Sequence, residues 1–260
     1  MPRSSALDDD GLTALISRAD SDGLAAVLTA ESWLPGPRAN LALAARFADL
    51  VAMSNQRVAL WPVLLRWLAV PPAVAPANDP GVFLPVCAAQ ALGAIFIISN
   101  GARQQEIVSL LRTAADDERW RVREAVAIAL QRIGEHDMGA LRAIVDEWLP
   151  EANLTGQRAI VAGLAHPPLL KDEATARYAL VTADRVLHVV QQTDARQRTT
   201  ESFRILRKAL EYALSVFIAA LPAAGIPWLR HWQSSNDPMI QRIIRQNLGK
   251  TRLKRVLGTG

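Results

Sequence analysis

Two stretches of this 260-residue sequence share one pattern. Residues 116–134 are DDERWRVREAVAIALQRIG, and residues 235–255 are SNDPMIQRIIRQNLGKTRLKR. Each stretch begins with an acidic or Asp-Pro turn, continues as a helix anchored by valine or isoleucine, and then reaches a glycine. Because one helical hairpin cannot bury both of its apolar faces, further hairpins must stack on it. The pattern therefore indicates an array of helical hairpins.

The first stretch divides into an apolar and a polar face. One helical face holds the apolar side chains Val122, Val126, Ala129, Leu130 and Ile133. The opposite face holds in part the polar side chains Arg121, Arg123, Glu124, Gln131 and Arg132. The acids Asp116, Asp117 and Glu118 come before the helix, where carboxylates cap free N–H groups and oppose the positive end of the helix dipole. We expect Gly134 to end the helix as a left-handed cap.

The rest of the chain follows a similar rhythm. Equivalent helix anchors are expected at Val82, Val122, Gln157, Phe203 and Ile240. They are spaced 40, 35, 46 and 37 residues apart, a range that surrounds the ~40–47 residues of one class of helical repeat. No run of alternating polar and apolar residues suggests a strand. The sequence therefore predicts an all-α fold, a right-handed α-α superhelix of about six to seven helical hairpins.

The two ends of the chain differ in charge and pattern. Residues 1–36 predict an N-terminal acidic helical hairpin, since residues 1–35 hold two arginines and six acids. Residues 37–260 predict the repeat array. Within it, residues 71–80, PPAVAPANDP, are too rich in proline to form a helix. They predict either a linker after an N-terminal subdomain or a long loop between repeats, and we favour the loop.

The residues 116–134 resemble a HEAT repeat of the short bacterial type, and residues 235–253 are similar to the same unit. The resemblance is specific over about 40 residues. Elsewhere from Arg38 onward, the chain shares only the spacing of the helices with such repeats. Some members of this superfamily are DNA alkylation-repair proteins, whose helices cradle duplex DNA and surround a damaged nucleotide with Trp, Asp and Arg side chains. The pairs Trp120–Arg123 and Trp228–Arg230, with Trp232, resemble that set. No aspartate can be matched to a catalytic one.

Composition limits the other function classes. The single Cys87 excludes an internal disulfide and fits a reducing compartment, and residues 1–10 contain no secretory signal. We therefore expect a protein of the bacterial cytoplasm. The apolar stretches Val82–Ile98 and Ala209–Leu229 are expected to be buried helices, since the first is short and the second contains Glu211 and two prolines. We expect no membrane association.

Positive charge gathers toward the C-terminus. Residues 185–260 hold thirteen Lys and Arg against four acids. Such a surface can attract phosphates or an acidic protein partner, but a solvated terminal repeat has the same composition. A second possibility is a ladder of Arg123, Arg158, Arg204 and Arg242 at equivalent places in successive repeats, where arginine can also be purely structural. The basic candidates for macromolecule binding are Arg123, Arg158, Arg204, Arg207, Arg230, Arg242, Arg245, Lys250, Arg252, Lys254 and Arg255.

Three tryptophans complete the candidate site. Trp228 and Trp232 lie four residues apart and flank Arg230, so their rings could stack on a base or a peptide, although core packing explains them equally simply. Trp120 begins the helix of the first stretch. Trp148 ends a helix before Pro150 and is expected to be a packing residue.

Catalytic motifs are absent from the sequence. There is no HExxH, CxxC, GxGxxG, GxxxxGK[ST] or GxSxG, so no metal, nucleotide cofactor or activated serine is indicated. The sequence thus favours a non-catalytic scaffold that binds another macromolecule, preferably a protein, through its concave surface and without a cofactor. The alternative is a DNA-binding protein that uses the basic C-terminal half, with an enzymatic activity of the alkylbase-glycosylase kind.

Overall fold

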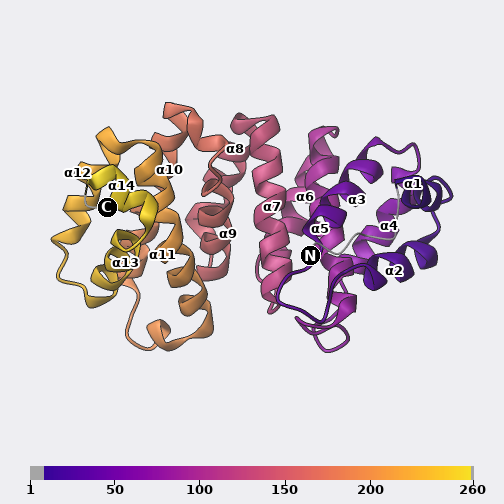
Figure 1. Ribbon diagram of the computed structural model, residues 1–260, viewed down its shortest axis with the longest axis horizontal. Helices are drawn as coiled ribbons and strands as arrows, with labels where there is room; N and C mark the ends of the chain where they lie inside the picture. Colours follow the sequence, from indigo (N-terminus) through magenta and orange to yellow (C-terminus); the bar gives the residue numbers. More distant parts are fainter. Residues whose placement is uncertain (1–8, 259–260) are drawn as a thin grey trace. The chain divides into compact units, whose positions relative to one another are not determined.

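The computed structural model describes residues 9–258, which form fourteen α-helices and four short 3-10 helices and contain no strand (Figure 1). The α-helices are α1 (Asp9–Ser17), α2 (Ser21–Ala30), α3 (Leu41–Met53), α4 (Arg57–Leu68), α5 (Phe83–Ile97), α6 (Gly101–Ala114), α7 (Trp120–His136), α8 (Met138–Trp148), α9 (Leu154–Leu164), α10 (Glu173–Gln192), α11 (Glu201–Ala220), α12 (Pro222–Gln233), α13 (Pro238–Leu248) and α14 (Thr251–Leu257). The 3-10 helices are η1 (Pro80–Val82), η2 (Leu149–Glu151), η3 (Leu169–Lys171) and η4 (Gln197–Thr199). The predicted all-α class is confirmed, and fourteen consecutive helices supply seven hairpins.

The chain divides into two units, and the division falls inside α7. Unit 1 ends at Ile133 and unit 2 begins at Gly134. The predicted boundary at residues 36/37 stays a prediction; in unit 1, α2 packs on α5. The right-handed superhelical course of the whole chain stays a prediction.

Unit 1 is built around α5. This helix packs against α2, α3, α4 and α6, and it is buried on every side, with Gln90 as its one buried polar side chain. The stretch Pro80–Ile97 is long and apolar enough to cross a membrane, but 78% of it is buried inside the protein. A core helix passes that test as readily as a membrane span, so α5 has a sufficient explanation in the packing of unit 1.

Helix α7 completes unit 1 with the face that the sequence predicts. Val122, Val126, Ala129, Leu130 and Ile133 are all buried. The predicted polar face is wrong for two of its five residues, however, because Arg121 and Arg123 are buried as well, with only 4% and 6% of their surface exposed. The predicted end of the helix is also wrong: α7 continues through Gly134 to His136. Gly134 is needed for close packing, since a Cβ there would lie 2.5 Å from Cδ2 of Leu141.

The buried arginines at the start of α7 hold the proline-rich residues 71–80. Arg119 donates to the carbonyl oxygen of Ala75 at 3.2 Å, and Arg121 donates to that of Ala77 at 2.8 Å. A second donor of Arg121 bonds the carbonyl oxygen of Gly36 at 2.5 Å. Residues 71–80 therefore form a loop inside unit 1 that is fixed by hydrogen bonds from the following repeat.

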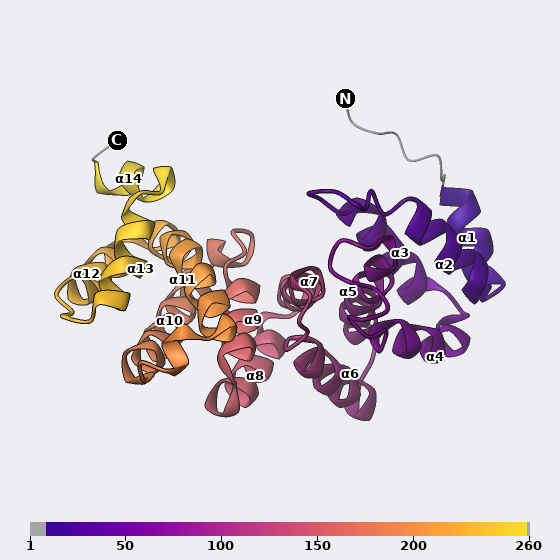
Figure 2. The ribbon, with the colours of Figure 1, turned by 90° about the horizontal axis from the view of Figure 1, so that it is seen from below.

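Unit 2 consists of two layers of helices around α11. In one layer α11 packs between α9 and α13. Helices α10 and α12 pack on α11 from the second layer, in which α8 also lies (Figure 2). The Asp-Pro turn predicted before α13 caps that helix, because Asp237 Oδ1 accepts the N–H groups of Met239 and Ile240. Burial would raise the pKa of the Asp237 carboxyl, but hydrogen bonds from Arg198 and from this backbone outweigh it and hold the pKa below its usual value.

Candidate functional site

A run of hollows follows α10 in unit 2. The first has a volume of about 300 Å³ and lies between α10 and α12, lined by Arg177, Leu180, Val181, Asp184, Ala224 and Trp228. The second, of about 620 Å³, lies toward α8 and shares Arg177 and Val181 with the first. The third, of about 450 Å³, shares Asp172 with the second. Because neighbouring hollows share lining residues, we call the three together the α10 groove.

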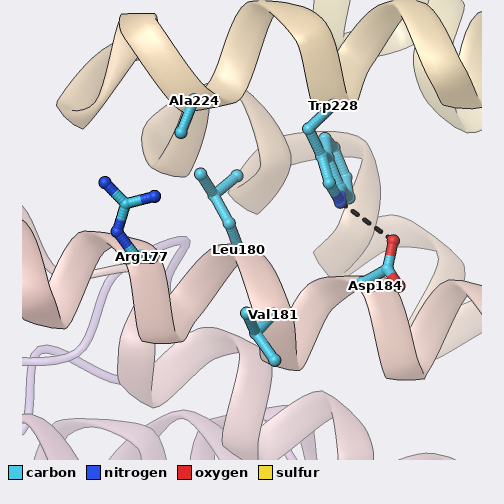
Figure 3. Close-up of a pocket in the computed structure, with 6 residues that line it drawn as sticks. All are labelled: Arg177, Leu180, Val181, Asp184, Ala224 and Trp228. Carbon is cyan, nitrogen blue, oxygen red and sulfur yellow. Dashed lines mark hydrogen bonds between the residues drawn. The ribbon is translucent and has the colours of Figure 1, made fainter.

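The groove exists because of the helical period of α10. Its residues at positions 177, 180, 181 and 184 recur every three to four residues, so they face the same side of the helix. Figure 3 shows Arg177 at one end of the first hollow, Asp184 and Trp228 at the other, and Leu180 and Val181 between them. Val181 is 49% exposed, so part of the apolar lining of the hollow is open to solvent.

The wall of the first hollow is fixed by one carboxylate. Asp184 Oδ1 accepts the indole N–H of Trp228 at 3.0 Å and that of Trp232 at 2.9 Å. The two indole rings lie 6.3 Å apart, and the ring of His188 meets Trp232 edge-on at 5.0 Å. Trp232 is buried, whereas Trp228 is half-buried and lines the hollow. The cluster therefore holds the Trp228 ring in a fixed orientation beside the groove.

The second hollow has a polar cluster of its own. The Tyr178 hydroxyl donates to Asp146 Oδ1 at 2.9 Å, and the Arg142 guanidinium lies over the Tyr178 ring at 5.2 Å. Burial and the Asp146 carboxylate raise the pKa of the Tyr178 hydroxyl well above its usual value, so it remains a hydrogen-bond donor. At the far edge, hydrogen bonds from Thr175 lower the pKa of the Asp172 carboxyl. The second hollow thus brings together the cations Arg142 and Arg177 and the anions Asp172 and Glu173.

The structure separates the predicted binding residues into different surroundings. In unit 1, Trp120 is half exposed and stacks under Arg121 at 4.2 Å, while Arg123 is buried and donates to the carbonyl oxygens of Asp117 and Glu118. Arg123 therefore stabilises a turn and cannot be reached by a partner. In unit 2, Trp232 is likewise enclosed. Of the three predicted tryptophans, Trp228 alone reaches the α10 groove.

The predicted basic residues of α9 to α14 lie outside this groove. Arg204 is exposed and paired with Glu201 at 2.5 Å, Arg207 and Arg242 share Glu211, and Arg252 lies over the Tyr212 ring at 4.5 Å. Arg158 is half-buried on α9, and Lys250 is half-buried before α14. Arg230, Arg245, Lys254 and Arg255 are exposed. Arg204, Arg207, Arg242 and Arg252 are thus engaged by carboxylates and a ring of the same unit.

Sequence reasoning missed Asp184, which organises the site. The available signal was the need of a buried indole N–H for an acceptor. Trp228 and Asp184 are 44 residues apart, and so are the bonded pairs Arg121–Ala77 and Arg119–Ala75 in unit 1. This separation falls within the spacing of the predicted repeat anchors, so a search one repeat upstream of Trp228 would have found the carboxylate.

The chain matches no family model and no curated protein. Among solved structures it is similar to an engineered protein, Northeast Structural Genomics Consortium target OR329, with 19% identity, 98% of each chain covered and a TM-score of 0.37. It is also similar to the designed armadillo repeat protein YIII(Dq)4CqI, with 17% identity, a TM-score of 0.35, and 93% of this chain and 98% of that chain covered. No residue role is assigned from either of them.

Proposed function

We propose that this protein is a non-catalytic helical-repeat scaffold that binds an extended segment of a partner protein along the α10 groove of unit 2. The observation that supports the proposal is the prepared wall of the first hollow. Asp184 holds two indole N–H groups before any ligand arrives, so Trp228 keeps its orientation without losing further side-chain entropy on binding.

The dimensions of the groove suit a peptide backbone. Arg177 and Asp184 are seven residues apart on one helix, which corresponds to about 10 Å along the axis. A polyproline-II segment advances about 3.1 Å per residue, so three residues span that distance and side chains three apart return to one face. Leu180 and Val181 then lie under the middle of the segment, where an aliphatic side chain of the partner would cover exposed apolar surface.

The charges favour a protein over a nucleic acid. A phosphate backbone needs a run of available cations, because its affinity comes from counterion release. The α10 groove carries charges of both signs instead: Arg177 pairs with Glu173 at 2.7 Å, and the acids Asp172 and Asp184 border it. A surface that carries both positive and negative charges suits a polypeptide that carries both.

The proposal predicts that a negative charge at position 181, in the middle of the first hollow, weakens peptide binding. Octapeptides selected from a random display library on the wild-type protein are expected to bind the Val181→Glu variant at least tenfold more weakly, because a carboxylate would replace the apolar floor. Val58→Glu is the matched control, since Val58 is a helical valine of unit 1 that is 80% exposed. Fluorescence anisotropy measures the affinities. Failure to select any peptide, or equal binding to both variants, would reject the proposal.

Duplex DNA provides the contrasting measurement. The alternative function predicts binding that weakens steeply between low and moderate salt and depends on the exposed arginines of the C-terminal helices. The variants Arg242→Ala, Arg245→Ala and Arg252→Ala then test that surface directly. We expect a labelled 20-base-pair duplex to bind weakly and these three substitutions to leave peptide affinity unchanged, because none of them borders the α10 groove.

A further inference from the structure

The two carboxylate oxygens of Asp184 have different partners. Oδ1 accepts both indole N–H groups, at 3.0 Å and 2.9 Å. Oδ2 has one described ion-pair neighbour, His188 Nε2, at 3.5 Å, which is beyond a good hydrogen bond. The side chain remains 37% exposed, and it borders the first hollow. The described hydrogen bonds thus hold Asp184 through Oδ1, while the partly exposed carboxylate as a whole borders the groove.

The structural task of Asp184 does not require its charge. Two neutral N–H donors on one oxygen could be accepted by a carboxamide, since a carbonyl oxygen has two lone pairs. The indole N–H groups are neutral, so their hydrogen bonds do not cancel the negative charge of the carboxylate. The cluster thus places a full negative charge beside a half-buried indole face, and these are the two elements that attract an organic cation.

We infer that Asp184 and Trp228 form a subsite for a positively charged side chain, a lysine or arginine of the partner segment. The cation would sit on Oδ2 while its alkyl stem lies along the Trp228 ring. This inference rests on the proposed function for the source of the cation, because it identifies one end of the bound peptide. Arg177, at the other end of the hollow, then faces an acidic side chain about three residues away in that peptide.

The opposite charges at the two ends define the ligand class. The bound segment carries a basic residue and an acidic residue three positions apart, with an aliphatic residue between them. Arg177 already donates a hydrogen bond to Glu173, but both side chains are exposed and the pair is weak, so a ligand carboxylate can compete for Arg177. A neutral or all-acidic segment would leave the Asp184 charge uncompensated in the covered groove.

The cation subsite can be tested without any peptide. The probes are n-butylguanidinium and its neutral isostere n-butylurea, titrated while the indole N–H resonance of Trp228 is followed by two-dimensional NMR. We expect saturable shifts with an affinity for the cation at least tenfold above that for the urea. In Asp184→Asn, which keeps an acceptor for both indoles, we expect this preference to fall to less than twofold. Equal affinities in the wild type, or a preference that survives in Asp184→Asn, would overturn the inference.

A second pair of probes separates this inference from the proposed function. The octapeptide GPEPLKPG carries the acid–aliphatic–base spacing, and its partner replaces lysine by norleucine. We expect the lysine peptide to bind at least tenfold more tightly to the wild type and equally with its partner to Asp184→Asn. If the small cation binds as expected and neither peptide binds, the proposed peptide binding is rejected and the cation subsite is kept. If both peptides bind with equal affinity, the cation subsite is rejected and the proposed peptide binding is kept.

Discussion

Replacing Gly93 by valine is expected to lower the free energy of unfolding of unit 1 by about 3 kcal/mol. A Cβ at this position would lie 2.8 Å from both Cα and Cβ of Ala129 and 3.1 Å from its carbonyl oxygen. The obstacle is largely the backbone of α7, which cannot move aside as a flexible side chain can. Helices α5 and α7 would have to separate along their whole interface, and urea denaturation followed by circular dichroism measures the cost.

Gly249→Val is the matched control for this substitution. A Cβ at Gly249 meets nothing closer than the carbonyl oxygen of Gln246 at 3.5 Å, an ordinary contact distance. We expect its effect to stay below about 1 kcal/mol, the range of helix propensities. If Gly93→Val unfolds at the same urea concentration as Gly249→Val, the close approach of α5 and α7 is not a requirement of the fold.

The second large effect is expected for Arg121→Met, which should destabilise unit 1 by about 3 kcal/mol. Arg121 donates to the carbonyl oxygens of Gly36 and Ala77 and to the Asn78 side chain, and methionine supplies none of these bonds. Burial also lowers the pKa of this guanidinium, which reflects the cost of enclosing its charge. The acceptors left without donors lie in residues 71–80 and before α3, so we expect faster proteolysis in both places.

Arg103→Met is a suitable comparison within the same unit. Arg103 also stacks on a tryptophan, Trp61, at 4.0 Å, but it is exposed and its ion pair with Glu106 lies on one helix. Such a pair contributes about 0.5 kcal/mol or less. Equal stability of the two methionine variants would show that Arg121 is not needed to hold the loop.

Local patterns were sufficient to predict the helices. The apolar stripe of α7 is buried in full. A period of 3.6 residues places its five apolar side chains on one face of the helix, so packing that face against the core covers all of them. The Asp-Pro turn before α13 also forms as predicted, because the carboxylate caps the helix next to it. These features depend on residues close together in the sequence, and for that reason they could be derived from it.

The errors come from contacts that the helical period does not contain. The face opposite the apolar stripe predicts that Arg121 and Arg123 face solvent, but both are buried against carbonyl oxygens of loops. Arg121 reaches Gly36, 85 residues upstream, whereas Arg123 bonds the acidic turn just before its own helix, the structural role that is one of its two predicted alternatives. The glycine rule likewise predicts a helix end at Gly134, whereas its close contact with Leu141 becomes visible only in three dimensions.

The candidate site was only half predictable. The i, i+4 pair Trp228–Trp232 was found from spacing, but spacing could not decide which ring is enclosed. The structure buries Trp232 and places Trp228 beside the groove, and the acceptor of both N–H groups comes from another repeat. Exposure of Val181 depends on the shape of the gap between α10 and α12, which no periodicity describes.

Photo-crosslinking from the rim of the α10 groove tests the central claim most directly. Benzoylphenylalanine at Ala174, an exposed residue of the second hollow, is compared with the same group at Val58 of unit 1. With the labelled peptide GPEPLKPG or a library-selected octapeptide, we predict a crosslink at position 174 that unlabelled peptide suppresses, and none at position 58. Equal crosslinking at both positions, or crosslinking at position 174 that excess peptide does not suppress, would contradict the assignment of the groove as the binding site.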